Sequence, residues 1–141
     1  VKKFSPLVKG NLPVDKKTLT FLRGALRAVV TSGTARGSFA GVGVEVSGKT
    51  GTGQVFGKNP NGSSKDDTSW FASFAPSKDP QYTVVMMVSQ GGTGSGTSAP
   101  SVRAIYEALF GIQGNKVTPS QAIFPSGPPS QIPRRPVVAK P

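Results

Sequence analysis

The sequence predicts an α+β domain in which helices flank an antiparallel sheet meander. Apolar residues recur at helical spacing in residues 14–32 and again after residue 98. Between these segments lie three stretches with the alternation or the apolar content of strands, at residues 42–55, 68–75 and 81–90. Turn-forming residues separate the three stretches, so consecutive strands are expected to pair antiparallel.

The first predicted helix covers residues 14–32. Asp15 is a suitable N-cap and Gly33 is placed to end the helix. Residues 31–41 are rich in glycine and are expected to form a flexible connection into the next element. The apolar stripe of this helix consists of Leu19, Leu22, Leu26, Val29 and Val30, and its expected solvent face carries Lys16, Lys17, Arg23 and Arg27.

The central strand is predicted over residues 42–55, where valine occupies every second position from 42 to 46. A lysine, two threonines and two glycines follow on the same strand. Lysine supplies a fixed positive charge, hydroxyls can bind a carboxylate, and glycine lets a substrate backbone come close to the strand. The strand is therefore expected to carry a functional edge made of Lys49, Thr50, Gly51 and Thr52.

The strands after this edge are predicted from their turns and their composition. Residues 56–67 concentrate turn formers, which predicts an exposed hairpin loop with Asn61-Gly62 near its tip. Residues 68–75 are aromatic-rich and extended. Residues 81–90 are apolar on both faces, as expected of an inner strand covered on two sides. Residues 91–96 are expected to be a linker.

The second predicted helix begins near Ser98, its expected cap, with Pro100 in its first turn, and it ends at Gly111. Beyond it, residues 114–141 combine proline and basic residues with no acid, which predicts a mostly disordered tail. The domain proper is therefore expected to cover residues 1–113. The buried stripe of the second helix is expected to consist of Val102, Ile105, Tyr106, Leu109 and Phe110.

The composition excludes several classes of site. Seventeen basic and six acidic residues give a net charge of +11, but they are scattered and form no basic stripe with interleaved aromatics. They indicate a solvated surface, and no nucleic-acid partner is expected. The sequence contains no cysteine and no histidine, which excludes disulfides, thiolate chemistry, a His/Cys zinc site and a Ser-His-Asp triad within this chain. No metal or cofactor is expected.

An alternative motif overlaps the lysine edge. Residues 43–50 satisfy the phosphate-loop pattern G-x-x-x-x-G-K-[ST], which makes a nucleotide-binding module an alternative hypothesis. That loop must follow a buried strand and open a helix. Residues 37–41 form a poor buried strand, and Gly51 and Gly53 would interrupt the first helical turns. The context therefore favours the strand over the phosphate loop.

The order of motifs resembles a known family. The stretches S-G-K-T-G-T-G-Q-V, D-T-S-W-F-A-S-F-A-P and Y-T-V-V-M-M-V-S-Q-G-G-T-G-S-G-T-S-A-P lie in that order along the chain. From residue 6 to about residue 112, the sequence resembles the C-terminal third of the transpeptidase domain of class B penicillin-binding proteins, and more narrowly the elongation-type enzymes of actinobacteria. The resemblance implies part of the penicillin-binding-protein and serine β-lactamase fold. It also implies D,D-transpeptidation of peptidoglycan stem peptides through a serine acyl-enzyme that β-lactams inhibit.

The resemblance also implies residue roles. Lys49 would support the proton transfers and draw in the substrate carboxylate, which Thr50 and Thr52 would bind through their hydroxyls. The backbone N–H of Thr52 would form half of an oxyanion hole. Gly51 would keep the strand open for the acyl group, and Gln54 is expected near the bound substrate. Strict pleating places Lys49 on the opposite face from Thr50 and Thr52, so an edge-on cleft or a local twist is needed.

The family's other two motifs, Ser-x-x-Lys and Ser-x-Asn, do not occur in the sequence. The nucleophilic serine is therefore expected on the N-terminal remainder of the same protein, acting as a companion to this chain. The resemblance further implies a membrane anchor on that remainder and a location on the extracytoplasmic face of the bacterial membrane. Stem peptides and β-lactams are the expected ligands. A non-catalytic interaction domain with a basic, proline-rich tail remains a third hypothesis.

Overall fold

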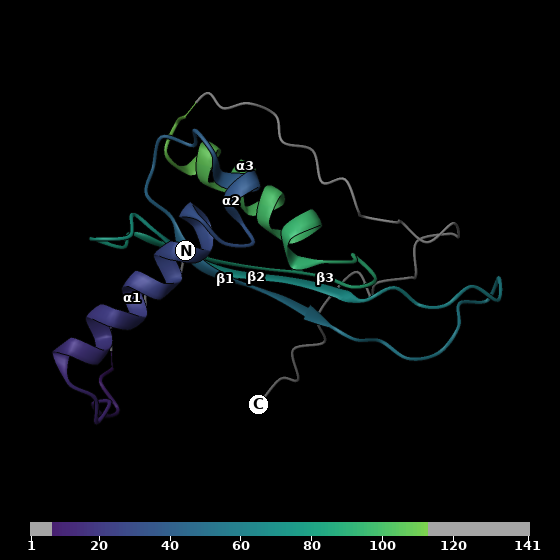
Figure 1. The fold of residues 1–141 in the computed structure, drawn as a ribbon, viewed down its shortest axis with the longest axis horizontal. Helices are drawn as coiled ribbons and strands as arrows, with labels where there is room; N and C mark the ends of the chain where they lie inside the picture. The colour runs from purple at the N-terminus through teal and green to yellow at the C-terminus, as the bar shows by residue number, and fades with distance from the viewer. Residues whose placement is uncertain (1–6, 113–141) are drawn as a thin grey trace, which may run out of the picture.

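The computed structural model describes residues 7–112 as three helical elements and a π-helix around a three-stranded antiparallel sheet, in the order β1-β2-β3 (Figure 1). The predicted α+β class and the meander are confirmed. The tail predicted for residues 114–141 lies outside the described residues. The elements are α1 (Lys16–Thr31), α2 (Arg36–Phe39), β1 (Ser47–Gly53), β2 (Thr68–Ala75), β3 (Tyr82–Val88), the π-helix η1 (Gly94–Ser98) and α3 (Ala99–Leu109).

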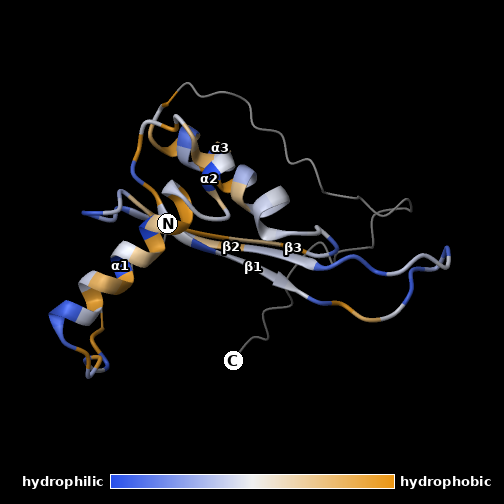
Figure 2. Cartoon of the chain, viewed as in Figure 1, coloured by the Kyte–Doolittle hydropathy of each residue, from blue (hydrophilic) through white to orange (hydrophobic). Residues whose placement is uncertain are grey.

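Helix α1 begins and ends close to the predicted positions. The Asp15 side chain accepts a hydrogen bond from the Thr18 N–H at 2.7 Å, as expected of an N-cap, and the pKa of its carboxyl is lowered mainly by that bond. The predicted apolar stripe is only partly used, because Val30 is buried whereas Leu19 and Leu22 are exposed. The N-terminal half of the helix projects away from the sheet and is rich in apolar residues (Figures 1 and 2), of which Leu19, Phe21 and Leu22 are exposed.

The segment predicted as a flexible connection, residues 31–41, contains the short helix α2. Ala35 and Phe39 are buried, and the Phe39 ring packs on that of Phe71 with their centroids 5.4 Å apart. The prediction of flexibility was wrong because burial of these two side chains fixes the segment. Arg27, predicted to face solvent, instead donates a hydrogen bond from Nη1 to the Val46 carbonyl at 2.8 Å.

Strand β1 begins five residues later than predicted, at Ser47 rather than at residue 42. Gly41 and Gly43 have φ values of +68° and +76°, which are incompatible with a strand. The prediction that Gly43 is a strand residue was therefore wrong. Val42 and Val46 are nevertheless buried in the core. The alternation of valines therefore correctly indicated buried side chains, although these residues do not pair as a strand.

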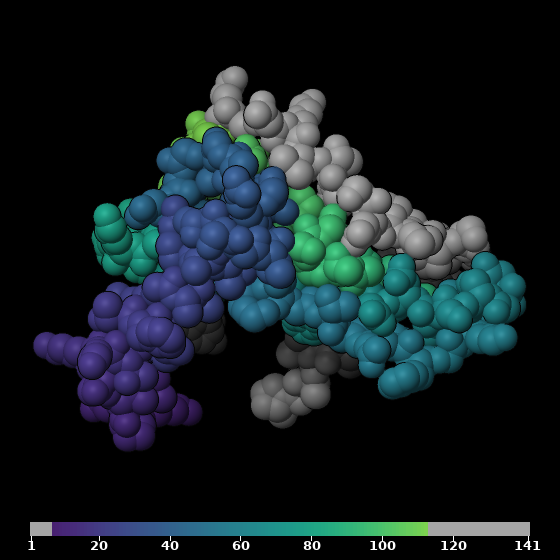
Figure 3. Space-filling model, in the orientation of Figure 1, coloured from purple at the N-terminus to yellow at the C-terminus, as the bar shows by residue number. Residues whose placement is uncertain are grey.

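Strand β2 has the predicted bounds and lies at the centre of the sheet. The loop that precedes it forms a bridge between Lys58 and Ser64 and projects from the molecule at the opposite end from α1 (Figure 3). Strand β3 pairs only with β2 among the described strands, so within residues 7–112 it lies at the edge of the sheet, whereas residues 81–90 were predicted as an inner strand. One face of β3 is exposed, with Val85 59% and Met87 50% accessible.

The residues predicted as a linker, 91–96, run into the π-helix η1, which continues directly into α3. Ser98 has helical backbone angles and makes no side-chain cap, contrary to prediction, whereas Pro100 lies in the first turn as expected. Gly111, with φ of +63°, follows the end of the helix. Leu109 is exposed, so the buried stripe of α3 is narrower than predicted.

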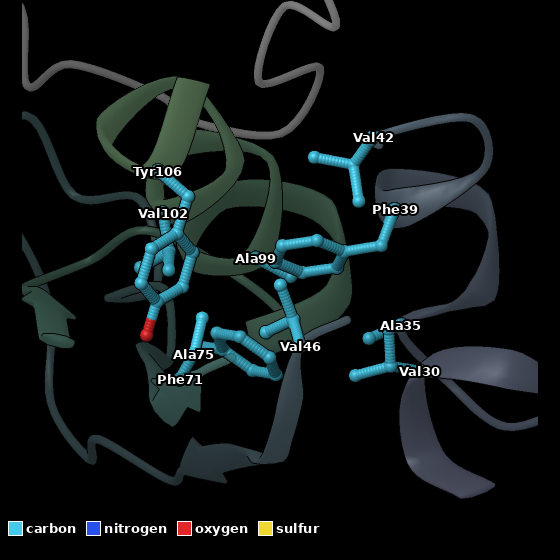
Figure 4. Close-up of a cluster of buried hydrophobic side chains, with 10 residues drawn as sticks. All are labelled: Val30, Ala35, Phe39, Val42, Val46, Phe71, Ala75, Ala99, Val102 and Tyr106. Carbon is cyan, nitrogen blue, oxygen red and sulfur yellow. The ribbon is translucent and has the colours of Figure 1, made fainter. Parts of the chain in front are cut away.

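The core lies between the sheet and the helices, as Figure 4 shows. Tyr106 of α3 is fully buried, and its hydroxyl lies 3.0 Å from that of Ser73 on β2. Burial raises the pKa of the Tyr106 hydroxyl. Within residues 7–112, no helix combines the length and the apolar character needed to cross a membrane. The core consists of Val30, Ala35, Phe39, Val42, Val46, Phe71, Ala75, Ala99, Val102 and Tyr106.

Candidate active site

The lysine edge predicted from the sequence lies on β1, at the border of the described sheet. β1 pairs only with β2, so its other side is open in this part of the chain. Lys49 is opposite Ala72 in the pairing, and Thr52 is opposite Ser69. All four residues of the predicted edge fall within the strand. Gln54 lies one residue beyond its end and is exposed.

The pleat divides the edge into two faces, as the sequence predicted. Thr50 pairs with the buried Phe71 and therefore lies on the covered side of the sheet. Lys49 pairs with the exposed Ala72 and lies on the uncovered face of the sheet. The Lys49 ammonium nevertheless bends to its own strand, where Nζ donates to the Thr50 carbonyl at 2.6 Å. Its charge is thereby held beside the Thr50–Gly51 peptide, which lies between the two threonines of the edge.

The Thr50 hydroxyl has a partner from outside the strand. Its Oγ1 lies 2.7 Å from Oγ1 of Thr34, a residue of the turn between α1 and α2. Thr34 lies in the segment predicted as a flexible connection and was not among the predicted site residues. No local motif marks this residue, since its contact with Thr50 arises only when α1 packs on β1.

The Thr52 hydroxyl is held by η1. The backbone N–H of Gly94 donates to Thr52 Oγ1 at 3.4 Å, a long hydrogen bond. Gly94 also lies so close to β1 that an added Cβ would come within 2.6 Å of the Gly51 carbonyl oxygen. A side chain at Gly51 would in turn approach Trp70 Cβ at 3.2 Å. Glycine is therefore needed at position 94 for η1 to support the strand.

Two serines fix η1 behind the site. The hydroxyls of Ser69 and Ser98 are 2.6 Å apart, and both side chains are fully buried. Ser69 Oγ also donates to the Thr93 carbonyl at 2.9 Å and accepts from the Ser98 N–H at 3.1 Å. Because buried hydroxyls must find partners, these bonds hold the residues on both sides of Gly94 to β2.

The phosphate-loop alternative does not fit this geometry. Its last four residues, from Ser47 to Thr50, lie in β1, and the chain continues to Gly53 as strand with no helix opening there. A phosphate loop needs backbone N–H groups converging at a helix N-terminus. Among the described residues there is also no cluster of three or more acidic, histidine or cysteine residues suited to a metal.

The candidate site is therefore a Lys-Thr-Gly-Thr edge strand in an α+β segment, and the glycine-containing π-helix η1 supports this strand. Residues 1–107 match the penicillin-binding protein transpeptidase domain family, and the chain belongs to this family. The narrower resemblance to elongation-type actinobacterial enzymes stays a prediction.

Individual relatives agree with this assignment. The chain is 34% identical over 94 residues to the peptidoglycan D,D-transpeptidase MrdA of Haemophilus influenzae, covering 60% of this chain and 14% of the relative. It is 32% identical over 106 residues to a peptidoglycan D,D-transpeptidase FtsI homolog of Chlorokybus atmophyticus, covering 72% and 16%. The structure of PBP2 from Pseudomonas aeruginosa in complex with WCK 5153 matches with a TM-score of 0.59 and 33% identity, covering 67% of this chain and 19% of that one. The chain thus spans less than a fifth of the length of these relatives.

Proposed function

We propose that this chain supplies the Lys-Thr-Gly strand of a peptidoglycan D,D-transpeptidase and acts with a companion segment that carries the nucleophilic serine. The single observation that supports this most directly is the edge strand β1, whose two threonine hydroxyls are both held by contacts from other elements. The relatives that carry the name D,D-transpeptidase are consistent with it. The domain would end near residue 113, and residues 114–141 would form a separate tail.

In the proposed mechanism, the substrate lies along the edge of β1 that does not pair with β2. The serine hydroxyl of the companion attacks the carbonyl carbon of the scissile D-Ala-D-Ala peptide bond, the terminal D-Ala leaves, and an amine of a second stem peptide then takes the acyl group. Hydroxyls of Thr50 and Thr52 would donate to the terminal carboxylate, and the Lys49 charge would attract it. The Thr52 N–H would contribute to the oxyanion hole, and Gln54 would lie beside the bound substrate.

Gly51 has a specific part in this proposal. Without a side chain, its peptide leaves room on β1 for an acyl group to lie alongside the strand. A β-lactam would occupy the same place, because its carboxylate and its reactive carbonyl present the same two groups. Cell-wall synthesis would place the enzyme on the extracytoplasmic face of the bacterial membrane.

The test is Thr52→Ala in the complete enzyme, this chain together with the serine-bearing segment. Loss of one hydrogen bond to a charged group should slow second-order acylation by a fluorescent penicillin about ten- to a hundredfold. Thr83→Ala, an exposed threonine of β3, is the matched control and should acylate normally. Undiminished acylation in Thr52→Ala would contradict the proposal. Gly43, the first residue of the phosphate-loop pattern, is not a suitable control position. Its φ of +76° would strain an alanine there and could change the fold as well as the activity.

A further inference from the structure

Thr34 is a polar residue that the proposed function leaves unused. It lies 16 positions before Thr50 in the sequence, yet the two hydroxyl oxygens are 2.7 Å apart. Thr34 is exposed and Thr50 half-buried, so the pair lies at the surface where a ligand on β1 would arrive. This contact is at ordinary hydrogen-bond distance for two hydroxyls.

The turn that carries Thr34 is fixed on both sides. A Cβ added at Gly33 would lie 2.9 Å from Val29 Cα, which shows how closely that residue packs on the last turn of α1. Ala35 is fully buried, and its N–H donates to the Val29 carbonyl at 3.0 Å. The Thr34 backbone therefore has little freedom to move away from β1.

The direction of the hydrogen bonds matters, because a hydroxyl has one proton to give and two lone pairs to accept with. Gly94 N–H can only donate, so Thr52 Oγ1 must accept from it and keeps its own proton for another acceptor. Thr50 keeps its own proton in the same way only if Thr34 is the donor in the hydrogen bond between the two hydroxyls. Both threonines would then point a proton outward to one anion, and donation from Thr34 would polarise the Thr50 hydroxyl further.

We propose that Thr34 is a positioning residue for carboxylate recognition: its hydroxyl donates to Thr50 Oγ1, so that Thr50 donates its own proton to the carboxylate of a stem peptide or a β-lactam. The proposal rests on the proposed function, in which Thr50 and Thr52 bind that carboxylate. It adds a residue from the α1–α2 turn to a recognition site otherwise built on β1 and η1.

The test compares Thr34→Val, which keeps the branched shape, with Thr34→Ser, which keeps the hydroxyl, in the complete enzyme. Second-order acylation is measured with benzylpenicillin and with its methyl ester, which lacks the carboxylate. Thr34→Val should lower the ratio of the acid rate to the ester rate about three- to tenfold, the effect of one hydrogen bond, and Thr34→Ser should restore the ratio. An unchanged ratio in Thr34→Val, including equal losses for acid and ester, would overturn the proposal.

Two further variants separate this proposal from the proposed function. Thr50→Ala and Thr52→Ala are measured in the same assay. If neither lowers the ratio of acid to ester rates, carboxylate binding by β1 is wrong and Thr34 has nothing to position. If both lower the ratio and Thr34→Val does not, the proposed function stands and only the role of Thr34 is refuted.

Discussion

Arg103 is a charged side chain inside the core, with only 2% of its surface exposed. Its Nε donates to Glu107 Oε1 at 2.7 Å, and its Nη1 donates to the carbonyls of Ser38 and Ala40 at 3.1 Å and 2.7 Å. The guanidinium thereby ties α3 to the end of α2. The Ser38 carbonyl is buried and the other two acceptors are partly buried, so loss of the arginine would leave them with little or no access to another donor.

We predict that Arg103→Met lowers the free energy of unfolding by about 3 kcal/mol, since it leaves the Glu107 carboxylate and two carbonyls without their donor. Urea denaturation of the complete protein measures this difference. Arg36→Met, which removes an exposed arginine of α2, is the control and should change stability by less than about 0.5 kcal/mol. Equal stability of the two variants would show that Arg103 has no such role.

At this scale the sequence predicts a candidate site at Lys49 and its neighbours, because the motif is contiguous and its residue types suit carboxylate binding; the role of these residues stays a prediction. It could not identify Thr34 or Gly94. Their partners lie 16 and 42 positions away, and only the packing of α1 and η1 against the sheet brings them to β1. A hydroxyl or a glycine in a loop carries no periodic signal, so contacts of this kind need the tertiary structure.

Among the elements, η1 differs most from its prediction. Its glycine-rich sequence has the composition of a linker. Gly94, however, allows the backbone of η1 to lie close to the backbone of β1, and does not make the segment flexible. A Cβ at Gly94 would lie 2.9 Å from the Gly51 nitrogen as well as close to its carbonyl oxygen. Both contacts are with backbone atoms, which cannot rotate out of the way as a side chain would.

Gly94→Ala should therefore push η1 away from β1 and weaken the Gly94–Thr52 hydrogen bond. We expect acylation by a fluorescent penicillin to slow at least tenfold, because the Thr52 hydroxyl and N–H would move from their positions. Gly37→Ala is the matched control, since a Cβ there meets nothing within 4 Å, and it should acylate normally. Normal acylation by the Gly94→Ala variant would show that η1 does not position the strand.

Within the described residues, β1 and β3 differ from their predictions for two different physical reasons. Valine alternation correctly marked Val42 and Val46 as buried, but it carries no information on the positive φ of Gly41 and Gly43, which delays the strand. For β3, an apolar run indicates burial on both faces without revealing strand order. Here β3 lies at the edge of the described sheet, and Val85 on it remains exposed.

At the scale of the whole molecule, the described residues leave one face of the sheet uncovered. Trp70, Val85 and Met87 are 42%, 59% and 50% exposed, and the register places them next to one another across β2 and β3. Three strands with an open apolar face and an open edge are marginally stable in water and prone to associate. We propose that the serine-bearing companion covers this face.

The chain of residues 1–141 on its own should therefore self-associate, and co-expression with the companion segment should replace the self-associated species by a one-to-one complex. Val85→Lys places a charge in the middle of the exposed face, so it should reduce both kinds of association. Asn61→Lys adds the same charge at the exposed tip of the β1–β2 loop and should reduce neither. Size-exclusion chromatography with light scattering measures the unchanged chain and both variants, each alone and with the companion. A monodisperse monomer with a cooperative unfolding transition and no binding to the companion would refute the assignment of this face, because the exposed apolar side chains would then drive neither kind of association.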